Sequence, residues 1–179
     1  MDEFSLEPYH RRSIRLKGYD YTSPGGYFIT LVAYQRECLF GNIIDSKMEI
    51  NAYGMVVSSF WRELTNHFVN IMLDSFIVMP NHIHGIIFIK YPNTGLVDNT
   101  RAGLRPAPTE KHSLSEIIRS FKSFSAKEIN KSRGMNSVPV WQRNYYEHII
   151  RNNKELNDIR QCIVANIINW DKDIENTLT

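Results

Sequence analysis

Cysteine is scarce in this chain, since its 179 residues include only Cys38 and Cys162. Two cysteines are too few for a disulfide scaffold, and no Cys-x-x-Cys pair suggests a zinc site. No apolar run approaches the roughly 18 residues that a membrane-spanning helix needs. The charged start, MDEFSLEPYHRRSIRLKG, lacks the apolar core of a secretory signal. These absences predict a cytoplasmic protein that has no membrane association.

Charge of one sign is not in large excess overall, because the formal net charge is only +2. Its distribution is uneven. From Lys111 to Arg160, ten Lys or Arg residues stand against five Asp or Glu residues, a local net charge of +5. A second basic cluster lies in the N-terminal arm, residues 1–20. Two basic blocks are compatible with a polyanion partner, although charge alone favours ordinary solvated helix faces.

Hydrophobic residues make up 42% of the chain and charged residues 22%, values that are ordinary for one packed domain spanning residues 1–179. Strand-like segments alternate with segments spaced as in amphipathic helices. Strands are predicted over residues 27–34, 71–79, 82–90 and part of 140–150, and helices over 53–68, 113–133 and 152–170. The last two helices begin with capping boxes, Ser113-x-x-Glu116 and Asn152-x-x-Glu155. Residues 91–111 are predicted to form an exposed loop.

The resulting order is β-α-β-β-α-β-α, with the segment LFGNIIDSKMEI left without a regular element. The first six elements match the split βαβ arrangement of a ferredoxin-like sandwich. The predicted class is therefore α+β. One antiparallel sheet would carry helices on one side, and a C-terminal helix would follow.

His82-Ile83-His84 is the motif that carries the most chemical information. Side chains two residues apart in a strand point to the same face, so both imidazoles would lie together. Two neutral imidazoles form a natural pair of ligands for a divalent metal ion. Alone the pair is weak evidence, and a complete site needs a third ligand from elsewhere in the chain.

MPNHIHGIIFI resembles the His-hydrophobic-His motif of the HUH nucleases. More of the chain resembles the IS200-like transposase family, in its branch of REP-associated tyrosine transposases. Five blocks occur in the family's order: RRSIRLKGYDYTSPGGYFIT, CLFGNI, LDSFIVMPNHIHGI, IIRSFKS and VWQRNYYEHIIRN. The resemblance implies cleavage and rejoining of hairpin-bearing single-stranded DNA by a tyrosine on the last helix. It also implies a bound Mg²⁺ or Mn²⁺ that polarises the scissile phosphate.

The resemblance also assigns roles to residues of this chain. His82 and His84 would bind the metal, and Asn166 would be the third ligand. Glu147 and His148 would support the metal ligands from behind. DNA contacts would come from basic residues of the arm, of the helix after Ser113 and of the segment before the last strand: Arg11, Arg12, Arg15, Arg119, Lys122, Lys127 and Arg143.

Cys162 stands where the family's nucleophilic tyrosine is expected. Three interpretations are open: a decayed transposase, a domesticated DNA-hairpin binding protein without catalysis, and an enzyme with a cysteine nucleophile. Tyr145 and Tyr146 precede the last helix, and core packing or DNA stacking is favoured over a nucleophilic role for them. Trp141 is either a core residue or a stacking residue. An RNA-binding module is a rival from the fold alone, and a homodimer is possible.

Overall fold

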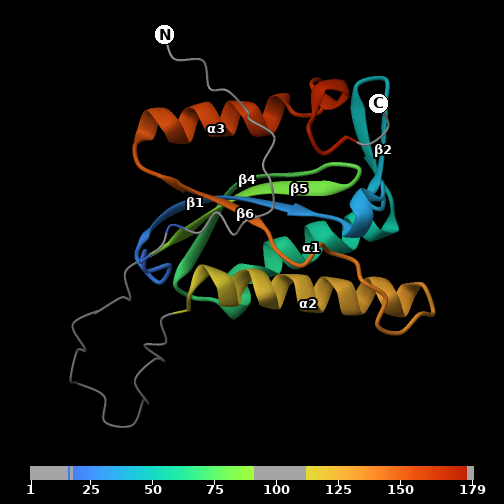
Figure 1. The fold of residues 1–179 in the computed structure, drawn as a ribbon, viewed down its shortest axis with the longest axis horizontal. Helices are drawn as coiled ribbons and strands as arrows, with labels where there is room; N and C mark the ends of the chain where they lie inside the picture. The colour runs from blue at the N-terminus through green and yellow to red at the C-terminus, as the bar shows by residue number, and fades with distance from the viewer. Residues whose placement is uncertain (1–15, 17, 91–111, 177–179) are drawn as a thin grey trace.

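The protein is described by a computed structural model that covers residue 16 and residues 18–90 and 112–176. Four strands form one antiparallel sheet in the order β4-β5-β1-β6 (Figure 1). They are β1 (Gly25–Val32), β4 (Ile71–Val78), β5 (His82–Ile89) and β6 (Tyr146–Ile150). The predicted ferredoxin-like arrangement is confirmed. The basic arm residues Arg11, Arg12 and Arg15, and the predicted loop 91–111, lie outside the described residues.

Helices α1 (Ala52–His67) and α2 (Leu114–Ser132) cover one face of the sheet (Figure 1). Asn51 caps α1, and the capping box predicted at Ser113 is present at the start of α2. The main core lies between these helices and the sheet. Trp61 of α1 lies against Gly85 of β5, where a Cβ atom would collide with the indole ring. None of the described helices is long and apolar enough to cross a membrane.

Helix α3 (Asn153–Ala165) lies on the opposite face of the sheet from α1 and α2 (Figure 1). Its Arg160 guanidinium donates to both carboxylate oxygens of Asp74 in β4, at 2.8 and 2.6 Å. The prediction that this helix continues to Trp170 is wrong. The chain leaves the helix after Ala165 and forms the short 3-10 helix η2 (Trp170–Lys172), which buries Trp170. The apolar spacing therefore continued beyond the helix itself.

A small hairpin of β2 (Gly41–Ile44) and β3 (Lys47–Ile50) occupies the segment predicted to be irregular. Its turn residues Asp45 and Ser46 have φ angles of 50° and 58°. Two left-handed residues between paired strands are the geometry of a type I′ turn. The turn lacks the Asn-Gly or Asp-Gly pair that usually marks it in a sequence, and much of the hairpin is exposed.

Candidate metal centre

The register of the sheet places His82 and His84 on the face that α3 covers. Each pairs with a residue of β1, since His84 lies opposite Thr30 and His82 lies opposite Val32. Their neighbour Ile83 points to the other face and is buried in the main core. The Nε2 atoms of the two histidines are 3.1 Å apart. The prediction that both imidazoles face one way is therefore confirmed.

Asn81 fixes the orientation of the His82 ring. The Asn81 side-chain Nδ2 donates to two backbone carbonyls, so its Oδ1 must be the atom that accepts from His82 Nδ1 at 2.9 Å. His82 therefore carries its proton on Nδ1 and presents the lone pair of Nε2 to the site. Both residues are fully buried, which leaves this arrangement no competition from water.

Thr30 plays the same part for His84. Its hydroxyl is 2.8 Å from His84 Nδ1 and is the neighbour of that ring across the strand pair. A hydroxyl can donate or accept, so His84 keeps its position in either tautomer. Partners on the second nitrogen are the usual means by which proteins orient a metal-binding histidine.

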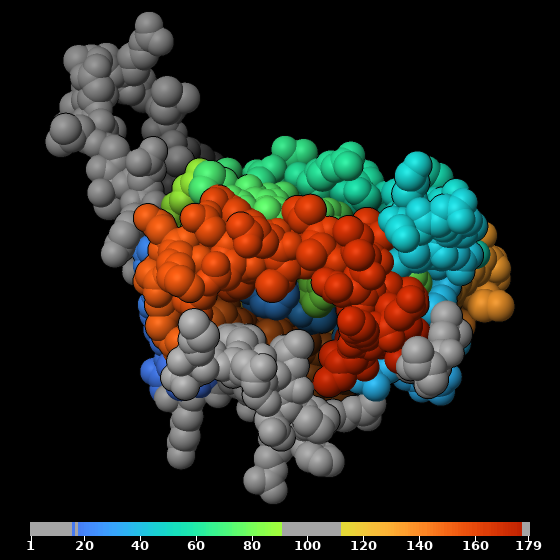
Figure 2. Space-filling model, turned by 90° about the horizontal axis from the view of Figure 1, so that it is seen from above, coloured from blue at the N-terminus to red at the C-terminus, as the bar shows by residue number. Residues whose placement is uncertain are grey.

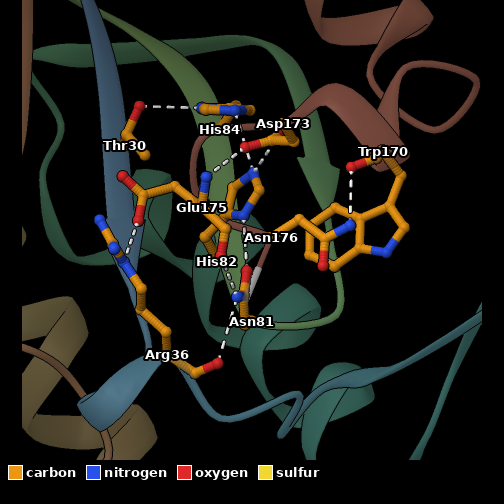
Figure 3. A network of polar contacts seen from close by, with 9 residues as sticks. All are labelled: Thr30, Arg36, Asn81, His82, His84, Trp170, Asp173, Glu175 and Asn176. Carbon is orange, nitrogen blue, oxygen red and sulfur yellow. Dashed lines mark hydrogen bonds and ion pairs between the residues drawn. The ribbon is translucent and has the colours of Figure 1, made fainter. Parts of the chain in front are cut away.

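Asp173 brings a carboxylate to the two imidazoles (Figure 3). Ligand atoms of His82, His84 and Asp173 all lie within 4.8 Å of one another. Asp173 Oδ2 is 3.7 Å from His82 Nε2, and Asp173 Oδ1 accepts the backbone N–H of Glu175 at 2.7 Å. The carboxylate is therefore held by its own turn with one oxygen directed at the histidines.

The segment that carries Asp173 is fastened to the strand end by a second set of contacts. Asn81 Nδ2 donates to the Glu175 carbonyl at 2.6 Å, and the Glu175 carboxylate accepts from Arg36 Nε at 2.8 Å. Asn176 donates to the Trp170 carbonyl, which closes the segment on itself (Figure 3). Asn81 thus contacts both His82 and the chain that delivers Asp173.

Burial sets the charge state of the cluster. It lowers the pKa of His82 well below its ordinary value, with a further lowering from His84, and it lowers the pKa of His84 to about 4. Burial also raises the pKa of the Asp173 carboxyl. Both imidazoles are therefore neutral at neutral pH, which is the form that binds metals. Two neutral nitrogens and a carboxylate oxygen suit a divalent cation such as Mn²⁺.

Asn166, the third ligand that the resemblance implied, lies directly after α3 and is half-buried. Its role stays a prediction, because the described contacts give its side chain no partner atom in the cluster. No local signal in the sequence marked Asp173, which follows the last helix and reaches the histidines only through the fold. Cys162 is exposed on α3, and its neighbour Ile163 is buried against the sheet.

Glu147 does not support the histidines as expected. It pairs with Ile29 of β1, and Ile29 belongs to the main core on the side of α1 and α2. Its side chain therefore lies on the opposite face of the sheet from the cluster. His148 is on the cluster's face, opposite Phe28, but its Nε2 is 2.6 Å from Glu155 of α3. The residues that do hold the histidines are Asn81 and Thr30.

The predicted DNA-binding residues of α2 and of the segment before β6 divide into two groups. Arg119, Lys127 and Arg143 are exposed. Lys122 instead directs its ammonium group at the carbonyls of residues 142–144, and burial lowers its pKa to about 8. Lys122 thus fastens the segment that carries Arg143 to α2. Trp141 is a core residue, since it is buried and its indole N–H lies 3.0 Å from the Ser125 hydroxyl.

Comparison with known proteins adds to this geometry. No family model matches the chain. A protein of Haemophilus influenzae named "Uncharacterized protein" is 40% identical over 168 residues, which cover 92% of each chain. The solved structure of a REP-associated tyrosine transposase bound to a REP hairpin superposes with a TM-score of 0.53 at 17% identity, over 92% of this chain and 74% of that one. The chain therefore belongs to the family of the Haemophilus protein, and its fold is the IS200-like transposase fold.

Proposed function

We propose that this protein binds hairpin-bearing or single-stranded DNA and places one backbone phosphate at a divalent metal ion held by His82, His84 and Asp173. The observation that carries the proposal is this His-His-Asp cluster on the sheet of an IS200-like transposase fold. The ion would supply a Lewis acid that polarises a phosphate oxygen. Mn²⁺ or Mg²⁺ would fill this role, and the two imidazoles favour Mn²⁺.

The chain's own residues prepare the site. Asn81 and Thr30 hold the two imidazoles so that their Nε2 atoms face one point. Asp173 supplies a negative charge that would partly neutralise the cation. Because these groups are already fastened by hydrogen bonds, little ordering would remain when the ion and the phosphate bind.

The DNA backbone would lie along basic residues beside α2. A groove of about 1050 Å³ runs between the second half of this helix and the segment up to residue 143. Its exposed basic lining residues are Lys127, Lys131 and Arg143, whereas Lys122 holds the two sides of the groove together. Arg119 and the arm residues Arg11, Arg12 and Arg15 would extend the contact. The solved transposase of this fold is bound to a REP hairpin, which supports a folded DNA as the ligand.

Cys162 decides between two chemical outcomes. We favour a protein that binds DNA without cleaving it, because a thiol at an exposed position of α3 replaces the tyrosine hydroxyl. Thiolates are soft nucleophiles and phosphorus is a hard centre. The second candidate is metal-dependent cleavage and rejoining of the strand by a cysteine nucleophile. The intact His-His-Asp cluster is the observation that keeps it open.

The test uses a DNA hairpin with single-stranded tails, labelled at either end, and the full-length protein. Fluorescence anisotropy with Mn²⁺ or EDTA measures binding, and a denaturing gel detects cleavage and covalent adducts. We expect Mn²⁺-enhanced binding that His82→Ala removes and that the exposed control His67→Ala retains. Equal binding of an RNA hairpin of the same sequence would favour the RNA-binding alternative, and absent DNA binding would overturn the proposal.

A further inference from the structure

Two aromatic side chains lie beside the metal cluster on the same face of the sheet. Phe28 of β1 stacks on the His84 ring, with centroids 5.2 Å apart and planes 28° from parallel. Tyr146 of β6 lies opposite Thr30, which itself lies opposite His84. The Tyr146 ring meets Phe28 edge-on at 6.2 Å. The aromatic pair, Phe28 and Tyr146, therefore continues directly from the cluster.

The aromatic pair is not sealed into a core. Both side chains are half-buried, whereas the rings on the other face of the sheet, such as Tyr27 and Trp61, are fully buried. The reason lies in the position of α3, which packs against β4 and is joined to it by Arg160 and Asp74. Seen from above, a hollow remains between α3 and the C-terminal segment, and β1 is visible at its floor (Figure 2).

We propose that Phe28 and Tyr146 form a binding site for one unpaired nucleobase, next to the phosphate held at the cluster. The inference rests on the proposed function and adds a subsite to it. A strand whose phosphate lies at His84 must place an adjoining nucleotide close by, and the Phe28 ring, which stacks on His84, offers an apolar surface on that side. Base stacking on aromatic side chains is a general means of binding single strands, and it tolerates any base.

The surroundings fit a base better than an apolar peptide. A base is flat and apolar on its faces but polar along its edges. Thr30 borders the aromatic pair on one side, and His148, paired with Glu155, borders it on the other. Aromatic residues on a sheet surface bind unpaired bases in this way in other folds of the same topology.

The test uses the DNA hairpin with a single-stranded tail in which 2-aminopurine replaces one tail base at a time. This base loses fluorescence when it stacks. At one tail position the wild-type protein should quench it. Phe28→Ala and Tyr146→Ala should abolish the quenching and weaken binding by roughly 5- to 150-fold, the range measured for single aromatic–base contacts. An abasic residue at that position should remove the difference between wild type and variants.

Matched variants separate stacking from other effects. Phe124→Ala removes an aromatic ring that is exposed on α2, on the other side of the sheet, and should bind like the wild type. Tyr146→Phe keeps the ring and should also bind like the wild type. A loss of affinity equal to that of Tyr146→Ala would assign the effect to the hydroxyl and overturn the proposed nucleobase site. Phe28→Leu keeps most of the volume and serves if Phe28→Ala fails to fold. It should lose the quenching.

The experiment distinguishes failure of the proposed function from failure of the nucleobase site. If the wild-type protein does not bind the tailed hairpin, both the proposed function and the nucleobase site are wrong. If the wild type binds and the Phe28 and Tyr146 variants bind equally well with unchanged fluorescence, the nucleobase site is wrong and the proposed function stands. Circular dichroism and thermal unfolding of each variant confirm that the fold is retained.

Discussion

Replacing Asp173 by Asn should weaken Mn²⁺ binding strongly, because it removes the only negative charge in the cluster of His82, His84 and Asp173. The change is nearly isosteric. The amide oxygen can still accept the Glu175 N–H, a bond of 2.7 Å that shapes the local turn. The segment should therefore stay in place while the charge is lost, so that the variant tests the carboxylate as a ligand and not the fold.

The size of the effect follows from the geometry. Asp173 Oδ2 is 3.7 Å from His82 Nε2, and a shared ion would lie closer than this to the carboxylate. At 3.7 Å and an effective dielectric constant of about 20, a divalent cation and a carboxylate attract each other by about 9 kcal/mol. Most of this offsets the loss of water from both partners. A remainder of about 2 kcal/mol corresponds to a roughly 30-fold change in Kd, which is the smallest loss we expect.

Isothermal titration with Mn²⁺ measures the change, and two other variants serve as comparisons. Asp171→Asn removes an exposed acidic group two residues away and should leave the affinity unaltered. Asn166→Ala tests the ligand that the family resemblance implied. A loss in Asn166→Ala together with unaltered binding in Asp173→Asn would refute the assignment of Asp173 and restore Asn166 as the third ligand.

Three further predictions concern the nucleophile position, pH and salt. Cys162→Tyr should create or greatly increase cleavage and a covalent adduct on the denaturing gel, and His82→Ala in that variant should abolish the gain; cleavage by the unchanged chain that survives Cys162→Ala would contradict this. In EDTA, the free energy of unfolding should fall as the pH drops from 6.5 to about 4, by up to about 3 kcal/mol from His84, because the unfolded chain takes up a proton that the folded chain rejects. Urea unfolding across that range measures this free energy. A flat pH profile of the wild type, with the same profile in His84→Gln, would count against the burial argument. Hairpin binding should weaken steeply with salt, and Arg119→Ala should lower the affinity for all sequences alike. An affinity that does not change with salt would exclude backbone contacts as its source.

Much of the fold could be predicted from the sequence because its elements have strong local patterns. The apolar runs on either side of Pro80-Asn81 became β4 and β5, and the Ser113 capping box begins α2. The hairpin of β2 and β3 could not be found in this way. Its strands are half exposed, and Asp45 and Ser46 adopt left-handed φ angles that their residue types do not predict.

The site was predictable only where it depended on one strand. His82 and His84 share a face because of the two-residue period, which needs no knowledge of the rest of the chain. The same two-residue period puts the side chains of Glu147 and His148 on opposite faces of the sheet. Only the register of β6 against β1 shows that Glu147 is the one that faces the core. A residue placed by a pairing between strands cannot be assigned to a face from its own strand alone, when that strand is short and mixed in polarity.

Asp173, the proposed third ligand, lies beyond any local pattern, because its position depends on how the chain returns after α3. Asn81 and Glu175 are 94 positions apart, yet their contact brings Asp173 to the histidines. Asn81 directly precedes the His82-Ile83-His84 motif from which the sequence predicts a metal site. Its amide uses its oxygen for His82 and its nitrogen for the Glu175 carbonyl, so one buried side chain orients the first histidine of the cluster and positions the segment that carries Asp173. The motif therefore encodes the histidines and also the means of completing their site, although the completing residue itself could be identified only from the fold.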